Sequence, residues 1–98
     1  MFERFTDLAR RSVVLAQESC RELRQPQINP EHLLLGISQV ETGIGAQVLA
    51  HFGITPSILR EFASTLSPAS PGRTDGHLPF SAESKSALES ALREALAL

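Results

Sequence analysis

The residues of this chain whose types and spacing could do chemistry are Glu31 and His32, which are adjacent and follow a proline. A carboxylate beside an imidazole can act as an acid–base pair or contribute two ligands to a metal ion. Either role needs further partners, and neither His51 nor His77 has ligand spacing to His32. The sequence therefore favours a helix-start carboxylate and a packed histidine over a metal or acid–base site.

The candidate nucleophiles are weak. Cys20 falls on the apolar stripe of the first predicted helix, where a cysteine usually acts as a small hydrophobic residue. No serine has the setting of a nucleophile elbow, and no Gly-x-x-x-x-Gly-Lys-Ser/Thr phosphate loop is present. We expect a protein that is not an enzyme and needs no cofactor, with a small hydrolase as a remote alternative.

A second set of candidate residues comes from both ends of the chain and suits peptide binding. Apolar anchors surrounded by a polar rim are how peptide-binding surfaces are built. The alternative is that the two phenylalanines of the set are ordinary core or hydrophobic-staple residues. The set consists of Phe2, Arg10, Val13, His77, Phe80, Lys85, Leu88 and Glu89.

Five helices and no strand are expected to position these residues, so the predicted fold class is all-α. The central helix begins with Asn29 as its N-cap and Pro30 at its first position, where a missing N–H is harmless. Its apolar residues surround most of its circumference, which indicates a helix buried on several sides. Apolar spacing of three and four predicts helices over residues 7–24, 30–40, 44–52, 55–66 and 80–98.

Composition limits the domain organisation and the partners. With 98 residues, 42% of them apolar, the chain can form one small domain with a modest core. A net charge of -2 argues against nucleic acid as the main partner. No apolar run resembles a signal peptide or reaches membrane-spanning length, so we expect no membrane contact and a cytoplasmic location.

An internal repeat relates the first and last predicted helices. Residues 67–79 are rich in proline, glycine and small polar residues, which predicts a flexible linker between residues 1–66 and residues 80–98. A helix-start pattern recurs 75 positions later, which is typical of units that cannot bury their apolar face alone. The matched pairs are Phe5 and Phe80, Thr6 and Ser81, Arg10 and Lys85, Val13 and Leu88, Ala16 and Ala91, Cys20 and Ala95, and Leu23 and Leu98.

Short blocks along the whole chain carry a resemblance to a known family. They are MFERFT at 1–6, VVLAQE at 13–18, EHLLLG at 31–36, FGI at 52–54, GHLPF at 76–80 and LREAL at 92–96. With them the chain resembles the N-terminal domain of the Clp chaperone ATPases, most closely the ClpC type of actinobacteria. The resemblance implies a fold of two four-helix repeats related by pseudo-twofold symmetry. The chain would hold the first repeat and the first helix of the second.

The resemblance also implies a function and two binding sites. The family domain docks substrates or adaptor proteins for an ATP-dependent Clp unfoldase–protease, and this is the function we expect. Glu31 matches a glutamate of a pocket for phosphorylated arginine, where the carboxylate pairs with the guanidinium. Family members often have threonine where Pro30 stands. The set that includes Phe2 and Phe80 matches a surface that takes cyclic peptide antibiotics in actinobacterial relatives.

Two questions stay open at this point. A free-standing chain would suit a decoy that sequesters the same peptide ligands or antibiotics. The predicted last helix carries a row of leucines that includes Leu88, Leu92 and Leu96. An exposed leucine row favours association, so one expectation is a homodimer through residues 80–98. The other is that this helix folds back and the chain stays monomeric.

Overall fold

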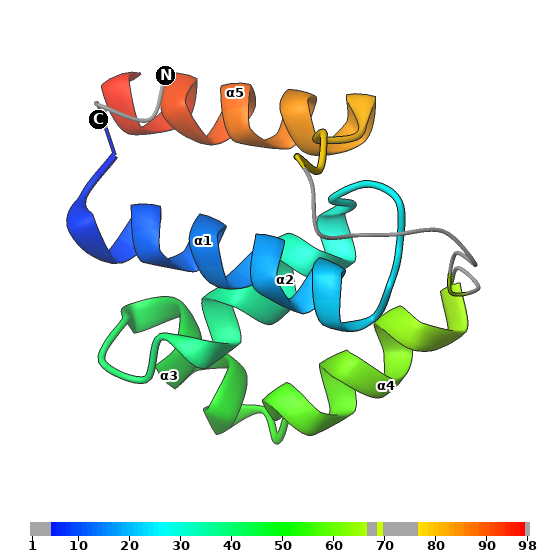
Figure 1. Ribbon diagram of the computed structural model, residues 1–98. Helices are drawn as coiled ribbons and strands as arrows, with labels where there is room; N and C mark the ends of the chain where they lie inside the picture. Colours follow the sequence, from blue (N-terminus) through cyan, green and yellow to red (C-terminus); the bar gives the residue numbers. More distant parts are fainter. Residues whose placement is uncertain (1–4, 67–68, 70–76, 98) are drawn as a thin grey trace.

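Five α-helices make up the regular structure of the residues that the structure describes. The computed structural model describes residues 5–66, 69 and 77–97, and the helices are α1 (Asp7–Glu22), α2 (Pro30–Gln39), α3 (Ile44–His51), α4 (Pro56–Leu66) and α5 (Ala82–Ala97) (Figure 1). Each predicted helix is present, and the all-α class is confirmed. Among these residues the strand-like pairing is limited to one parallel bridge, between Ile28 and Phe80.

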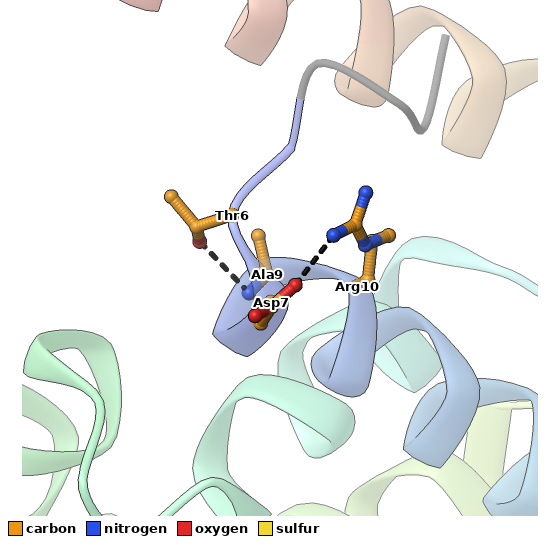
Figure 2. Close-up of polar contacts among 4 residues, drawn as sticks. All are labelled: Thr6, Asp7, Ala9 and Arg10. Atoms are coloured by element: carbon orange, nitrogen blue, oxygen red, sulfur yellow. Dashed lines mark hydrogen bonds and ion pairs between the residues drawn. The ribbon is translucent and has the colours of Figure 1, made fainter.

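The start of α1 follows the predicted capping chemistry. Figure 2 shows the Thr6 hydroxyl accepting a hydrogen bond from the Ala9 amide, at 3.1 Å. In the same view the Arg10 guanidinium reaches back to the Asp7 carboxylate, with 2.5 Å between nitrogen and oxygen. The N-cap bond satisfies one of the free amides of the first turn, and Asp7 lies at the positive end of the helix dipole.

The end of α1 differs from the prediction by two residues. Arg24 adopts a left-handed conformation with φ of 58°, so the helix stops at Glu22 rather than at Arg24. The Gln25 amide then donates to the Cys20 carbonyl at 3.1 Å, and the Arg24 amide donates to the Arg21 carbonyl at 3.0 Å. This is the Schellman pattern that closes many helices. The helix therefore ends before Pro26 is reached.

The end of α3 has the same geometry and lies one residue before the predicted end at Phe52. Gly53 has φ of 76°, and its amide donates to the Ala50 carbonyl at 3.0 Å. The Ile54 amide donates to the Leu49 carbonyl at 2.9 Å. Glycine adopts this conformation without the steric strain that a side chain adds, so the glycine followed by an apolar residue marked the helix end correctly.

The closest contact between helices lies where α2 crosses α1. A Cβ atom added at Gly36 would lie 2.1 Å from the Ser12 carbonyl oxygen and 2.9 Å from the Ala16 backbone nitrogen. Glycine is therefore required at this position, because any side chain would push the two backbones apart. Around the crossing lies much of the buried apolar core, which includes Ala16, Cys20, Ile28 and Leu35.

The segment before α5 is part of the core. The Ile28 amide donates to the Pro79 carbonyl at 2.8 Å, and the Ser81 amide donates to the Ile28 carbonyl at 3.0 Å. Leu78 is buried in the same cluster as Ile28, although it belongs to the range predicted as a linker. Most of that range, 67–68 and 70–76, lies outside the described residues. Phe80, expected to start the helix, instead precedes the cap residue Ser81, and α5 begins at Ala82.

Figure 1 shows α5 running beside α1 in the opposite direction, while α3 and α4 lie on the other side of α1 and α2. In the part of the chain that the structure describes, no single helix is long and apolar enough to cross a membrane. The pair formed by α2 and α3 reaches the required length and apolarity, but the two helices meet at a bend of 95°.

Candidate functional site

An apolar groove of about 360 Å³ opens between α1, α2 and α5. Of the described residues that line it, Ser12 is the one with a polar side chain. A concave apolar surface of this kind suits a peptide or an apolar side chain better than a charged ligand. The lining consists of Phe5, Ala9, Ser12, Val13, Pro30, Leu33, Leu34, Ile37, Ala87, Leu88 and Ala91.

Two residues of the predicted peptide-binding set lie in this groove. Val13 comes from α1 and is half-buried, and Leu88 comes from α5 with 9% of its surface exposed. They are repeat-related positions, so the groove lies where the two copies of the pattern face each other. Helix α5 thus packs against its own chain, and Leu92 one turn further is half-buried.

The charged members of the predicted set lie outside the groove lining. Arg10 is exposed and pairs with Asp7, and Lys85 and Glu89 are exposed on α5. His77 is exposed and precedes the buried Leu78. Phe2 lies outside the described residues. The structure therefore brings together the apolar pair of the set, while the predicted polar rim is at the surface of the same helices.

Phe80 occupies the position that the alternative interpretation described. It is half-buried and packs against the cluster of Ala16, Cys20, Ile28 and Leu78. It also takes part in the bridge with Ile28. Phe80 is therefore a core residue at the base of α5, and it does not line the groove.

Glu31 and His32 stand at the start of α2 and have different environments. Glu31 lies in the first turn and is half-buried, whereas His32 is fully buried. The His32 Nδ1 atom accepts a hydrogen bond from the Asn29 amide at 2.8 Å. This is the contact back to the N-cap that a glutamate makes in the usual capping box. Asn29 is the N-cap, and the prediction of a packed histidine is confirmed.

The other ring nitrogen of His32 connects α2 to α4 through Gln25. The His32 Nε2 atom is hydrogen-bonded to the Gln25 side-chain oxygen, and the Gln25 amide nitrogen donates to the Ala63 carbonyl at 2.9 Å. Because Nδ1 accepts, the imidazole proton is on Nε2. Burial lowers the pKa of His32 below its ordinary value, and the neighbouring Glu31 carboxylate opposes this shift.

Cys20 has the properties of a structural cysteine. Its thiol donates to the carbonyls of Gln25 and Gln27, at 3.3 and 3.1 Å. Burial raises the pKa of the Cys20 thiol to about 11, with Arg21 opposing the shift. A thiol that stays protonated is a poor nucleophile. Over the described ranges, no three His, Cys, Asp or Glu side chains come together as a metal site.

Gln25 is the residue of this region that the sequence did not reveal. It lies in the loop between α1 and α2 and is almost fully buried. In the sequence it is a polar residue between the end of a predicted helix and Pro26. A glutamine after a helix carries no periodicity or motif that indicates burial. The groove residues of α2 were more accessible to prediction, because its apolar residues surround most of its circumference.

Comparison with known proteins identifies the class. The family profile of the Clp repeat (R) N-terminal domain matches residues 4–98. The chain is 37% identical over 95 residues to chaperone protein ClpC1, chloroplastic, of Oryza sativa subsp. japonica, which covers 97% of this chain and 10% of that protein. The ClpA homolog of Guillardia theta, an ATP-dependent Clp protease ATP-binding subunit, is 36% identical over 95 residues, covering 97% of this chain and 12% of the relative.

The chain belongs to the Clp repeat N-terminal domain family. It is homologous to the N-terminal regions of Clp ATPases, and that domain is not itself catalytic. The same degree of identity, 37%, relates it to the chloroplastic ClpA homolog of Brassica napus, of which it spans 11%. The chain thus spans about a tenth of the length of the curated relatives that it matches.

Proposed function

We propose that this chain is a recognition domain that docks substrate or adaptor proteins for an ATP-dependent Clp unfoldase. The observation that carries the proposal is the apolar groove between α1, α2 and α5. It combines half-buried apolar side chains with exposed charges on the same helices, which is the composition of protein-binding surfaces. Membership of a family found at the N-termini of Clp ATPases supports the same role.

A pair of adjacent valines offers a matched test of the groove. Val13 lines it, whereas Val14 is 52% exposed and is not part of its lining. We expect Val13→Glu to weaken binding of a fluorescent, permanently unfolded protein by about tenfold or more, because a charge would enter an apolar anchor site. Val14→Glu adds the same charge one residue away and should leave the affinity unchanged.

Fluorescence anisotropy measures the affinity, and circular dichroism checks that both variants stay folded. Equal affinities for the wild type and a folded Val13→Glu variant would remove the groove from the proposal. Phe80→Ala does not test the groove. Because Phe80 packs in the core, its removal would alter folding as well as binding.

We further propose that Glu31 accepts the guanidinium of phosphorylated arginine on a substrate. Its carboxylate is half-buried in the first turn of α2, and it forms no ion pair with another described residue. A carboxylate in this state can form a bidentate contact with guanidinium. Glu31→Gln keeps the shape and removes the charge, so it should abolish binding of a phosphoarginine peptide while the helix survives on its N-cap.

Anisotropy with matched phosphoarginine and arginine peptides tests this proposal. A wild-type chain that does not distinguish the two peptides would end it. So would a Glu31→Gln variant that retains wild-type affinity for the phosphoarginine peptide. We propose cyclic peptide antibiotics as ligands of the surface around α1 and α5, so they should not compete with the phosphoarginine peptide at Glu31.

Association of two copies of the chain through α5 is a separate proposal. The buried Leu88 supports the alternative in which α5 folds back on its own chain. Light scattering across a concentration series separates the two states, since a monomer stays near 10.6 kDa. Leu92→Lys would convert a dimer to a monomer, whereas in a monomer it would mainly lower the melting temperature.

A further inference from the structure

Hydrogen bonds of the His32 imidazole and the Gln25 amide connect three segments of the chain. They are the start of α2, the loop between α1 and α2, and α4. The Asn29 amide donates to the imidazole, and the imidazole donates to the Gln25 oxygen. The Gln25 nitrogen then donates to the Ala63 carbonyl of α4. All three bonds run in the same direction, so the position of one proton on the ring fixes the orientation of the whole chain of bonds.

Ala63 is a suitable place for such a contact. It is the fourth residue from the end of α4, where backbone carbonyls lack a partner within the helix. Gln25 supplies that partner and is nearly inaccessible to solvent, as is Ala63. The side chain that closes the end of α4 is therefore held in place by the imidazole at the start of α2.

We propose that His32 and Gln25 form an acid-sensitive clasp that holds α4 against the α1–α2 loop and opens when the imidazole gains a second proton. An imidazolium has an N–H at both ring positions. The new proton on Nδ1 would point at the Asn29 amide, which is also a donor. The bond between them would be lost, and a positive charge would be buried.

The charged groups around the clasp do not compensate for this charge. Glu31 is next to His32 on α2 and favours the imidazolium, but burial outweighs its effect and the pKa of His32 is lowered. On α1, the Cys20 thiol is neutral. On α4, Arg60 pairs at the surface with Glu22 of α1 at 2.8 Å, and Glu61 is exposed. On α5, Lys85 and Glu89 are exposed.

The direction of the pH effect follows from the lowered pKa. An unfolded histidine titrates near 6.5, above the folded value, so in the window below 6.5 the unfolded chain binds more protons. The stabilisation from the clasp is complete above this pH and is lost as the pH falls toward the folded pKa. One proton changes the opening equilibrium by about tenfold per pH unit at the steepest point. The clasp belongs to the fold and does not depend on what the groove or Glu31 binds.

The wild-type chain provides the first test. Its other two histidines, His51 and His77, are exposed, so the ring signals of His32 can be compared with those of imidazoles at the surface. Nitrogen-15 NMR of the histidine rings should show His32 as the Nε2–H tautomer at pH 7.5. The pKa of its imidazole should lie below the ordinary value of 6.5, because burial disfavours the imidazolium. A His32 that titrates at or above 6.5 would overturn the proposal.

Hydrogen exchange gives the second readout. After correction for intrinsic rates, protection of the α4 amides around Leu59 and Ala63 should fall by about tenfold or more between pH 7 and pH 5. Protection in α4 that stays constant while His32 titrates would also overturn the proposal, because the histidine would then be buried without holding α4.

Removing the donor to α4 sharpens the test. Gln25→Glu replaces the amide nitrogen that donates to Ala63 with a carboxylate oxygen that only accepts, so α4 should already be poorly protected at pH 7.5, without the wild-type fall toward pH 5. Gln27→Glu makes the same change two residues away at an exposed position and should keep the wild-type trend. Identical trends in the two variants would contradict the clasp. If Gln25→Glu does not fold, the two wild-type measurements still decide.

Discussion

Helices α1 and α5 carry the same sequence pattern and begin in the same way, but they are buried to different extents. The Thr6 hydroxyl caps the Ala9 amide, and the Ser81 hydroxyl caps the Ser84 amide, both at 3.1 Å. Further along, Ala16 of α1 is completely buried, whereas its repeat partner Ala91 of α5 is exposed. A repeated pattern thus gives two helices with equal starts and unequal packing.

The difference comes from α2, which crosses α1 at Gly36 with almost no space between the backbones. Towards α5, α2 presents Leu33, Leu34 and Ile37, and the groove lies between these residues and α5. Local sequence therefore specifies a helix and its caps, while burial depends on which residue the neighbouring helix presents. Three pairs of substitutions test this comparison.

Gly36→Ala should have the largest effect. Its Cβ would lie 2.1 Å from the Ser12 carbonyl oxygen, and backbone must move to relieve that contact. We expect the free energy of unfolding to fall by about 3 kcal/mol or more, although alanine is the better helix former. Gly45→Ala is the comparison and should cost less, because its Cβ would lie 2.6 Å from the Cγ2 methyl group of Ile37, a side-chain atom rather than backbone. Urea unfolding measures both, and equal effects would refute the special role of the α1–α2 crossing.

Leucine at the repeat-related alanines should have an intermediate and unequal effect. Ala16→Leu would overfill a buried site and lower the free energy of unfolding by about 2 kcal/mol. Ala91→Leu changes an exposed residue and should stay within about 0.5 kcal/mol of the wild type. Thermal unfolding of the two single variants makes the comparison. A similar loss in both would show that α5 is as tightly packed as α1.

The two helix caps should give the smallest effects. Thr6→Ala and Ser81→Ala each remove one hydrogen bond to a free amide and should lower the free energy of unfolding by about 1 kcal/mol. Ser81 is buried and Thr6 is exposed, so we expect the larger loss at Ser81, where water cannot replace the hydroxyl. A larger loss at Thr6, measured by chemical denaturation, would reverse this order.

The fold class was predictable because each helix start depends on neighbouring residues. Asn29 with Pro30, Thr6, and Gly53 with Ile54 indicate helix ends through rules that act within a few residues. The left-handed conformation of Arg24 was not predictable in this way. Left-handed helix ends usually carry glycine, and this position holds arginine. The core role of Leu78 also depends on a distant partner, Ile28, which its surrounding proline and glycine residues do not reveal.

The site was predictable only in part, for the same reason. The sequence selected Val13 and Leu88 through the repeat, and both line the groove. It also selected Phe80 as an anchor, but a bridge with Ile28 draws that residue into the core. Gln25 escaped prediction entirely, because its partners His32 and Ala63 are set by tertiary packing.

The burial of Cys20 has a practical consequence. It is the single cysteine of the chain, and its thiol stays protonated and hidden while α1, α2 and their loop are assembled. A thiol-specific reagent can therefore modify the chain only after that region has opened. The labelling rate then measures how often this transient opening occurs. The molecule carries this reporter without any engineering. Mass spectrometry of the labelled wild-type chain can show whether a ligand in the groove lowers the labelling rate.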